Sequence, residues 1–184
     1  MTDTTAEESR LLAALASALV RQPRGTLQDL ARLVGVSKAT LYRFCNTREQ
    51  LIERLMKHGT DALHNAIDSA ELASGSPREA LSRFVNELLK HRQLVAFMNT
   101  HWRPLEEPAE ELAGWSEFLE KSDAFFLRGQ KEGVFRIDIS AAALSVTLNG
   151  LFCSLVDAEV YGRVAPASMA FILESMFMDG AAAR

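Results

Sequence analysis

Apolar residues recur at spacings of three and four positions along nearly the whole of this 184-residue chain. Leu11, Leu12, Leu15 and Leu19 set the pattern near the N-terminus, and no segment shows the sustained alternation that is typical of a half-buried strand. Such spacing makes one face of a helix apolar. The sequence therefore predicts an all-α fold of about nine helices.

Turn and capping residues mark the ends of the first three helices. The run Pro23–Gly25 stops the first helix, and Thr26 with Asp29 has the spacing of a capping box, in which a hydroxyl and a carboxylate satisfy the first backbone N–H groups of a helix. Gly35 suits the left-handed position that ends a helix, and Ser37 is a favourable N-cap. These signals predict a helix over 27–34, a glycine turn and a short helix over 38–44.

A second capping box, Thr47 with Gln50, precedes a long helix. Beyond the break at Ser74–Pro77, the same periodicity predicts five more helices, over residues 77–91, 93–102, about 108–132, about 140–161 and 166–179. We expect an N-terminal three-helix helix-turn-helix domain over residues 1–48 and a C-terminal helical domain over residues 49–184.

Charge is unevenly distributed along the chain. The whole sequence has a net charge of −4, yet residues 21–58 hold eight Lys and Arg against three Asp and Glu, a net charge of +5. Residues 59–184 carry a net charge of −7. A basic block on an acidic body indicates an anionic partner at one end of the molecule.

The short helix over 38–44 has the surface of a DNA-reading helix. At about 100° per residue, Lys38, Ala39, Tyr42 and Arg43 share one arc, and Leu41 lies opposite. A support helix, a glycine turn and this helix form a helix-turn-helix, whose second helix enters the major groove. We expect base contacts from Gln28, Lys38 and Ala39, and phosphate contacts from Thr26, Thr40, Tyr42, Arg43 and Arg48.

The stretch from Thr26 to Leu51, TLQDLARLVGVSKATLYRFCNTREQL, resembles the DNA-binding signature of the TetR family of bacterial transcriptional regulators. That signature reads approximately T-x-x-x-I-A-x-x-A-G-V-S-x-x-T-L-Y-R-H-F-x-S-K-E-x-L. The segments that align with it without a gap are Leu30-Ala31, Gly35-Val36-Ser37, Thr40-Leu41-Tyr42-Arg43 and Arg48-Glu49.

Two positions depart from the family pattern. Phe44 stands where the family often has a polar aromatic residue that touches phosphate, and Cys45 stands where it usually has a core Phe. We expect Phe44 to take over part of that packing.

The resemblance implies a cytoplasmic homodimer that binds a palindromic operator in double-stranded DNA. It also implies that the C-terminal domain serves dimerisation and holds a cavity for a small effector. We interpret the chain as a repressor that a small apolar or aromatic ligand releases from DNA. The candidate pocket residues are His91, Phe97, Met98, His101, Trp102, Trp115 and Phe118.

An uncharged segment lies between Asp138 and Asp157. Because polar residues interrupt it and Asp flanks it, we expect a helix buried on all sides and no membrane span. Small side chains at i, i+4, i+7 and i+11 predict a face that a second copy approaches closely, with the 166–179 helix completing a four-helix bundle. These residues are Ala143, Thr147, Gly150 and Ser154.

Nothing in the sequence supports an enzyme, because no Ser/His/Asp set, nucleophile elbow or phosphate loop is visible. His58, Asp61 and His64 spread around their helix, so no metal site and no cofactor are expected. Cys45 and Cys153 make no disulfide framework and no CxxC motif, and the polar, acidic N-terminus argues against a secretory signal.

Two alternatives stay open at this point. One is a DNA-binding regulator that has no small-molecule effector or that activates transcription. The other is a helical, dimeric interaction protein that does not bind DNA, an interpretation that the unusual residues Phe44 and Cys45 keep open.

Overall fold

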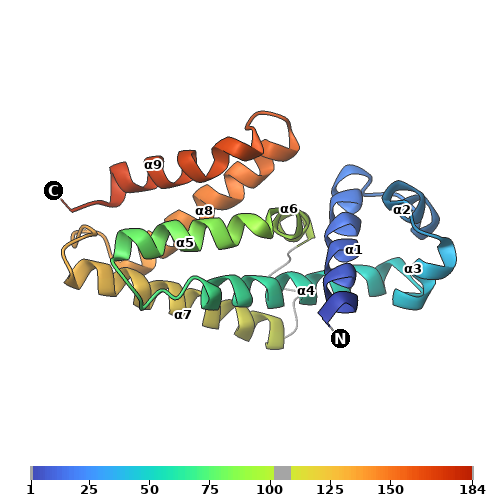
Figure 1. Ribbon diagram of the computed structural model, residues 1–184, viewed down its shortest axis with the longest axis horizontal. Helices are drawn as coiled ribbons and strands as arrows, with labels where there is room; N and C mark the ends of the chain where they lie inside the picture. Colours follow the sequence, from blue (N-terminus) through green and yellow to red (C-terminus); the bar gives the residue numbers. More distant parts are fainter. Residues whose placement is uncertain (1, 102–108, 184) are drawn as a thin grey trace.

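The computed structural model describes residues 2–101 and 109–183, and Figure 1 shows them as a long bundle of helices with a small helical unit at one end. The all-α prediction is confirmed: the described part contains nine α-helices and one 3-10 turn, and its β-structure is a single isolated bridge between Phe135 and Ala182. The helices are α1 Thr2–Arg21, α2 Leu27–Val34, α3 Lys38–Phe44, α4 Arg48–Ser69, α5 Pro77–Lys90, α6 Arg92–His101, α7 Ala109–Lys131, α8 Ala141–Val160 and α9 Met169–Ala181, with the 3-10 turn η1 at Pro166–Ser168.

The capping residues act as their spacing predicts in the first helices. The Asp29 N–H donates to Thr26 Oγ1 (3.2 Å), and the Thr26 N–H donates to Asp29 Oδ2 (3.1 Å), so the capping box of α2 is complete. Ser37 caps α3 by accepting from the Thr40 N–H (3.0 Å). Gly35 has a φ of 74°, a left-handed conformation that costs glycine little, and there the chain turns from α2 into α3.

The start of α4 differs from the prediction in one bond. Thr47 Oγ1 accepts from the Gln50 N–H (3.2 Å), as expected for the N-cap. The Gln50 side chain, however, accepts from the Asn46 N–H (2.9 Å) and not from the Thr47 N–H, so the second bond of the capping box is replaced by a bond to the preceding residue.

Helix α4 connects the two parts of the molecule. It runs for 22 residues from the end of the helix-turn-helix into the body (Figure 1). It contacts α1 in the small N-terminal unit and packs against α5, α6 and α7 in the body. The expected domain boundary between residues 48 and 49 thus falls at the first turn of a continuous helix.

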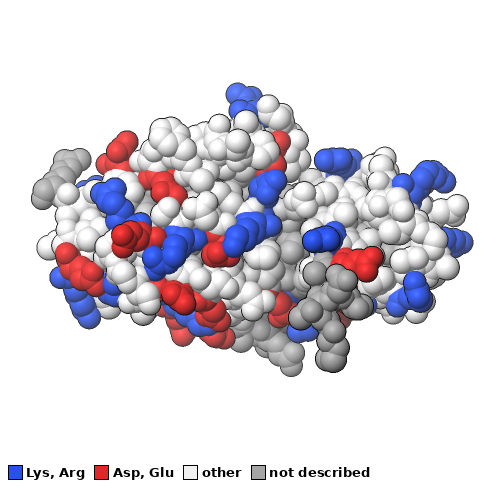
Figure 2. Space-filling view, in the orientation of Figure 1, with Lys and Arg blue, Asp and Glu red and all other residues white. Residues whose placement is uncertain are grey.

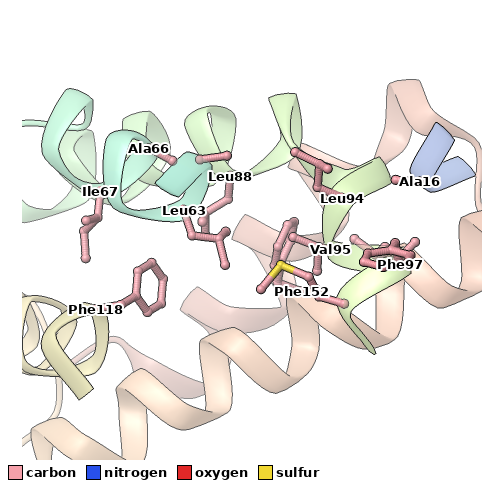
Figure 3. Close-up of a cluster of buried hydrophobic side chains, with 14 of the residues drawn as sticks. Ala16, Leu63, Ala66, Ile67, Leu88, Leu94, Val95, Phe97, Phe118 and Phe152 are labelled. Carbon is pink, nitrogen blue, oxygen red and sulfur yellow. The ribbon is translucent and has the colours of Figure 1, made fainter. Parts of the chain in front are cut away.

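Leucine side chains form the core of the N-terminal unit, whereas aromatic rings dominate the body. Leu15, Leu19, Leu30, Leu41 and Leu51 are fully buried. In the body, Figure 3 shows aromatic and aliphatic side chains from several helices meeting between them. The largest fully buried side chains of the body are Phe84, Phe97, Phe126, Phe135 and Phe152.

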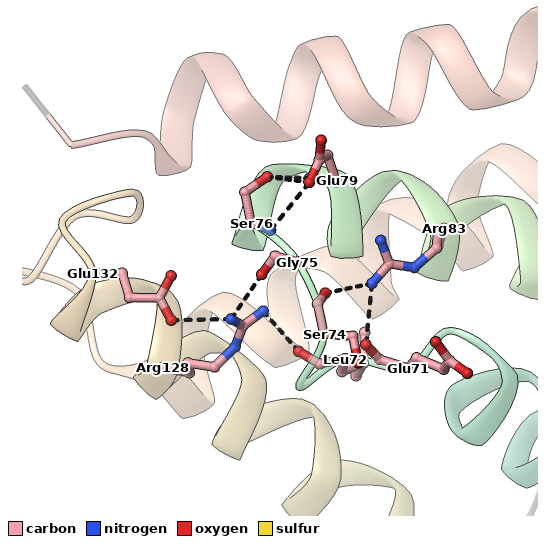
Figure 4. Close-up of polar contacts among 9 residues, drawn as sticks. All are labelled: Glu71, Leu72, Ser74, Gly75, Ser76, Glu79, Arg83, Arg128 and Glu132. Carbon is pink, nitrogen blue, oxygen red and sulfur yellow. Dashed lines mark hydrogen bonds and ion pairs between the residues drawn. The ribbon is translucent and has the colours of Figure 1, made fainter.

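Two arginines fix the turn between α4 and α5. Arg83 lies on α5 and Arg128 on α7, and both point their guanidinium groups at the backbone of this turn (Figure 4). A guanidinium carries several donors in a rigid plane, so one side chain can satisfy two or three carbonyl groups. The carbonyl groups that accept belong to Ala70, Glu71, Leu72, Ser74 and Gly75.

Helix α8 is exposed along one side, which corrects the expectation that it is buried on all sides. Leu144, Leu148 and Phe152 lie on its buried edge, whereas Val146 is 59% exposed. Within the described residues, α8 has the length and mean hydropathy (1.5) of a membrane span, and 33% of that stretch is buried. Length and composition alone are weak evidence for a span.

Candidate DNA-reading surface and interior cavity

The arc predicted for the short helix is present on α3. Leu41 points into the leucine core and has no exposed surface, whereas Lys38, Ala39, Tyr42 and Arg43 are exposed. One buried leucine therefore fixes the rotation of α3 about its own axis. That rotation turns two cations, a phenol and one small side chain toward solvent.

Lys38 and Tyr42 form a pair on this surface. The Lys38 ammonium lies 5.3 Å from the centre of the Tyr42 ring, one helical turn away. The Thr40 hydroxyl is 2.8 Å from the Ser37 hydroxyl, so it also takes part in the cap of α3. Lys38, Thr40 and Tyr42 thus each contact a neighbouring side chain without DNA.

The other predicted DNA contacts differ in how accessible they are. Gln28 is exposed in the first turn of α2. The Thr26 hydroxyl donates to Asp29 Oδ2 (2.6 Å), and this bond and the Thr26 N–H bond lower the pKa of the Asp29 carboxyl. Arg48 is half-buried: its Nη2 donates to the Pro23 carbonyl (2.7 Å), which ties the start of α4 to the turn after α1.

Arg54 is a residue that sequence reasoning missed. Its guanidinium lies 4.9 Å from the centre of the Phe44 ring and donates to the Phe44 carbonyl (3.1 Å). It also pairs with Glu8 on α1. Arg54 thus joins α1, the end of α3 and α4, and Phe44 packs partly into the core as expected. A lone arginine on a long helix carries no sequence signal for such a role.

Charged side chains divide the surface as the sequence predicts. Figure 2 shows Lys and Arg around the end formed by α2 and α3, and most Asp and Glu of this face over the body. An anionic partner is therefore attracted to the end that displays α3.

The body contains a cavity between α4, α6, α7 and α8. Its volume is about 360 Å³, which suits a small organic molecule. The described residues that line it are Leu63, Val95, Met98, Asn99, Trp115, Asn149, Phe152, Cys153, Ser154 and Asp157.

The predicted pocket residues do not all lie together. Met98 and Trp115 line the cavity, and Phe118 borders a space of about 10 Å³ beside it, with its ring stacked on Trp115 (5.4 Å between centres). Phe97 is fully buried and stacks on His101 (4.3 Å), and neither belongs to the cavity wall.

His91 also lies away from the cavity, because it caps the C-terminus of α5. Trp102 lies outside the described residues. Sequence reasoning missed the polar residues that α8 contributes to the cavity wall, Asn149, Cys153 and Asp157. The pattern of small and leucine residues on this helix gives no indication of a pocket.

The predicted small-residue stripe is exposed on α8. Ala143, Thr147, Gly150 and Ser154 all face solvent, and a β-carbon at Gly150 would meet no atom within 4 Å. Helix α9 also exposes large apolar side chains: Phe171 is 75% exposed and Met176 is 60% exposed. Contiguous exposed apolar patches are typical of protein–protein interfaces.

All four histidines are partly buried. Burial lowers the pKa of His58 and of His91, which keeps both rings neutral near pH 7. His64 Nε2 lies 2.9 Å from the Gly114 carbonyl oxygen, which accounts for that ring. Among the described residues, no three His, Cys, Asp or Glu side chains are grouped to hold a metal ion.

Comparison with known proteins agrees with this architecture, although no protein-family model matches the chain. The chain is 47% identical over 175 residues to the HTH-type transcriptional regulator NfxB of Pseudomonas aeruginosa, which covers 95% of this chain and 94% of that protein. It is 32% identical over 97 residues to the HTH-type transcriptional repressor LfrR of Mycolicibacterium smegmatis, which covers 53% of this chain and 50% of that protein.

Solved structures share the fold. The ketosteroid regulator KstR2 of Mycobacterium tuberculosis superposes with a TM-score of 0.75 at 16% identity, covering 95% of this chain and 94% of that one. The TetR-like regulator LfrR from Mycobacterium smegmatis, in complex with proflavine, superposes with a TM-score of 0.73 at 24% identity, covering 96% and 97%.

The exposed α3, held by a helix-turn-helix on an all-helical body, defines a DNA-binding regulator of transcription. This architecture and the similarity to NfxB over nearly the full length of both proteins together determine the family. The chain belongs to the TetR family of transcriptional regulators, which are not enzymes.

Proposed function

We propose that the chain represses transcription as a homodimer that places two copies of α3 in successive major grooves of a palindromic operator. The observation that carries this proposal is the face of α3, where Lys38, Tyr42 and Arg43 are exposed opposite the fully buried Leu41. A two-fold dimer presents two equal reading helices, so the half-site centres are expected about 34 Å apart, or a multiple of that distance.

Base recognition is assigned to Lys38 and Ala39, with Gln28 from α2. A lysine reaches guanine acceptors in the major groove, and a small side chain lets the backbone approach a thymine methyl group. Thr40, Tyr42 and Arg43 are assigned to phosphates, because hydroxyl and guanidinium groups are common phosphate donors.

Thr26 and Arg48 are assigned to the flanking phosphates. Thr26 is the N-cap of α2, and the N–H groups at a helix N-terminus favour an anion. Arg48 would approach a DNA phosphate from a half-buried position. Its hydrogen bond to the Pro23 carbonyl would orient the guanidinium group for that contact.

Dimerisation is assigned to α8 and α9. The exposed stripe of small residues on α8 supports a close approach of two helices, and the exposed Phe171 and Met176 on α9 supply apolar area beside it. Two helices from each protomer would form a four-helix bundle around the two-fold axis. Pairing of this face with a second copy would account for the apolar character of α8 without a membrane. The protein would then act in the cytoplasm.

Release from DNA is assigned to a small ligand in the cavity. Helix α6 lines the cavity with Val95, Met98 and Asn99, and it also packs against α1 of the N-terminal unit. A ligand that binds one arrangement of α6 more tightly shifts the population toward dimers whose reading helices no longer match the two grooves.

A gel shift with the DNA upstream of the chain's own gene tests the DNA-binding function, followed by footprinting of the bound fragment. The expected footprint is two-fold symmetric, and scrambled DNA of the same composition should bind at least about 1,000-fold more weakly at physiological salt. Equal affinity for the scrambled fragment, or a footprint without two-fold symmetry, would contradict the proposal.

A further inference from the structure

We infer that the cavity between α4, α6, α7 and α8 takes a cationic ligand with an aromatic or aliphatic body, for which the Asp157 carboxylate is the counter-ion. This inference rests on the effector function proposed above and specifies the chemical class of that effector.

The composition of the cavity wall favours such a ligand. Leu63, Val95, Met98 and Phe152 make most of it apolar, and Trp115 adds an aromatic surface that its stacking on Phe118 holds in place. Asp157 is the one charged side chain among the described residues of the wall. An apolar cavity with a single carboxylate is complementary to a molecule with an apolar body and one positive charge.

Arg92, the arginine of α6, is already paired with a different carboxylate. Arg92 Nε donates to both carboxylate oxygens of Glu159, at 3.0 and 3.1 Å, and Arg92 Nη1 donates to the Leu89 carbonyl. In the described part of the chain, Asp157 forms no ion pair with a Lys or Arg, and its hydrogen-bond donor is the neutral Asn99 amide (3.3 Å). The negative charge beside the cavity is therefore left for a ligand to neutralise.

Cys153, the neighbouring polar residue of the wall, adds no second negative charge. Burial, and then the negative charge of Asp157, raise the pKa of the Cys153 thiol to about 11, so the group is a neutral thiol at pH 7. Asp157 lies four residues further along α8 and lines the same cavity. One ligand cation therefore suffices for charge balance.

The position of Asp157 connects the ligand to the rest of the molecule. The Asn99–Asp157 hydrogen bond joins α6 to α8 at the cavity. An ammonium group donates more strongly to a carboxylate than a neutral amide does, so a bound cation competes with Asn99 for the Asp157 oxygens. The ligand would thus act on the contact between α8 and α6, and α6 also packs against α1.

Three probes with the same ring and different charges test the inference: 1-naphthylmethylammonium, 1-naphthylmethanol and 1-naphthylacetate. Calorimetric titration of the full-length protein at pH 7.5 should show the ammonium binding about 10- to 100-fold more tightly than the alcohol, with the carboxylate weakest. The ammonium should also slow maleimide labelling of Cys153, which places the probe in this cavity.

Two variants complete the test. Asp157→Asn should remove the preference for the ammonium and leave affinity for the alcohol within about twofold. Asp179→Asn, which removes the same charge from an exposed position at the end of α9, should change neither. If Asp157→Asn unfolds, the probe series on the unaltered protein still decides the question.

The outcomes distinguish failure of the cationic ligand class from failure of the proposed effector and DNA-binding functions. If the alcohol or the carboxylate binds as tightly as the ammonium, the cationic class is wrong while the effector cavity stands. If none of the probes binds at millimolar concentration, the inference is also overturned. The operator gel shift contains no small molecule and judges DNA binding independently.

Discussion

The side chain of Met98 on α6 packs directly against the backbone of Gly59 in the middle of α4. A β-carbon at position 59 would overlap the Met98 sulfur and lie 3.1 Å from Met98 Cγ. Because Met98 also lines the cavity, it provides a contact between a bound ligand and the middle of α4, beside the direct contact that Leu63 of α4 offers.

Gly59→Ala should alter ligand binding more than stability. The added methyl group pushes the Met98 side chain toward the cavity, whereas alanine favours the helix by about 1 kcal/mol and offsets much of the crowding. We expect the free energy of unfolding in urea to change by less than about 1 kcal/mol, with clearly weaker binding of a cavity ligand. Adding Met98→Ala should restore binding, and a double variant that remains as weak as Gly59→Ala would contradict this account.

Gly129→Ala should be much more damaging. Its β-carbon would overlap the Phe135 ring, which is fully buried and packs against Phe125 and Phe126 (5.6 and 5.1 Å between ring centres). A rigid ring without free space cannot move as Met98 does, so we expect a loss of about 1–3 kcal/mol in urea unfolding. An unchanged unfolding midpoint would show that this packing is looser than described.

Lys38→Ala and Arg43→Ala should weaken DNA binding in different ways. Loss of a base contact at Lys38 should cost about 1–3 kcal/mol on the operator and relax the preference at one base pair per half-site. Loss of a phosphate contact at Arg43 should weaken all DNA alike and lower the salt slope by about one unit per contact, or about two in the dimer. Binding titrations at several salt concentrations separate the two.

Arg163→Ala supplies the control for that pair, because it removes an exposed cation from the turn after α8, far along the chain from α3. It should leave operator affinity unchanged. If Lys38→Ala weakens operator and random DNA equally, then Lys38 reads no base.

Gly150→Leu should dissociate the dimer. No atom of the same protomer lies within 4 Å of a β-carbon at position 150, so the monomer has room for the leucine and a partner helix does not. Sedimentation at low micromolar concentration should show monomers. Ser69→Leu, an exposed position at the end of α4, is the matched control. A variant that stays dimeric would place the interface elsewhere.

The reactivity of Cys153 should rise steadily with pH. With its pKa raised to about 11 by burial and by Asp157, about one thiol in a thousand is ionised at pH 8, and each pH unit up to 10 should speed alkylation about tenfold. Asp157→Asn removes one cause of the shift and should lower the pKa. Peptide mass spectrometry separates Cys153 from Cys45, and a rate that levels off near pH 9 would contradict the shift.

The sequence predicts local features of this protein well because their causes are local. The capping box at Thr26, the left-handed Gly35 and the buried Leu41 each depend on residues within one turn, and together they determine which face of α3 is exposed. The periodicity of α8 likewise separates its leucine edge from the stripe around Gly150.

The cavity is less predictable because its wall is assembled from distant segments. Phe97 and Met98 are neighbours in sequence, yet Phe97 packs into the core and only Met98 reaches the cavity, since α6 has helices on several sides. Asp157 seemed to mark the end of an apolar stretch, and its place in the wall depends on how α8 packs against α6. Arg54 and Phe44 meet for the same reason, across ten positions of the chain.

Because α4 is continuous, a change in its angle inside the body also moves its beginning beside the helix-turn-helix. From Gly59, where Met98 bears on it, to Arg48, where it begins, the helix extends for 11 residues, or about 16 Å. A tilt of about 10° about that contact moves the beginning of the helix by about 3 Å. In a two-fold assembly both ends move, so the separation of the reading helices changes by up to about 6 Å against a groove repeat of about 34 Å. If a ligand in the proposed cavity changes the angle of α4 by this amount, its effect is largest at the end of the helix that lies farthest from the ligand, where the protein meets DNA.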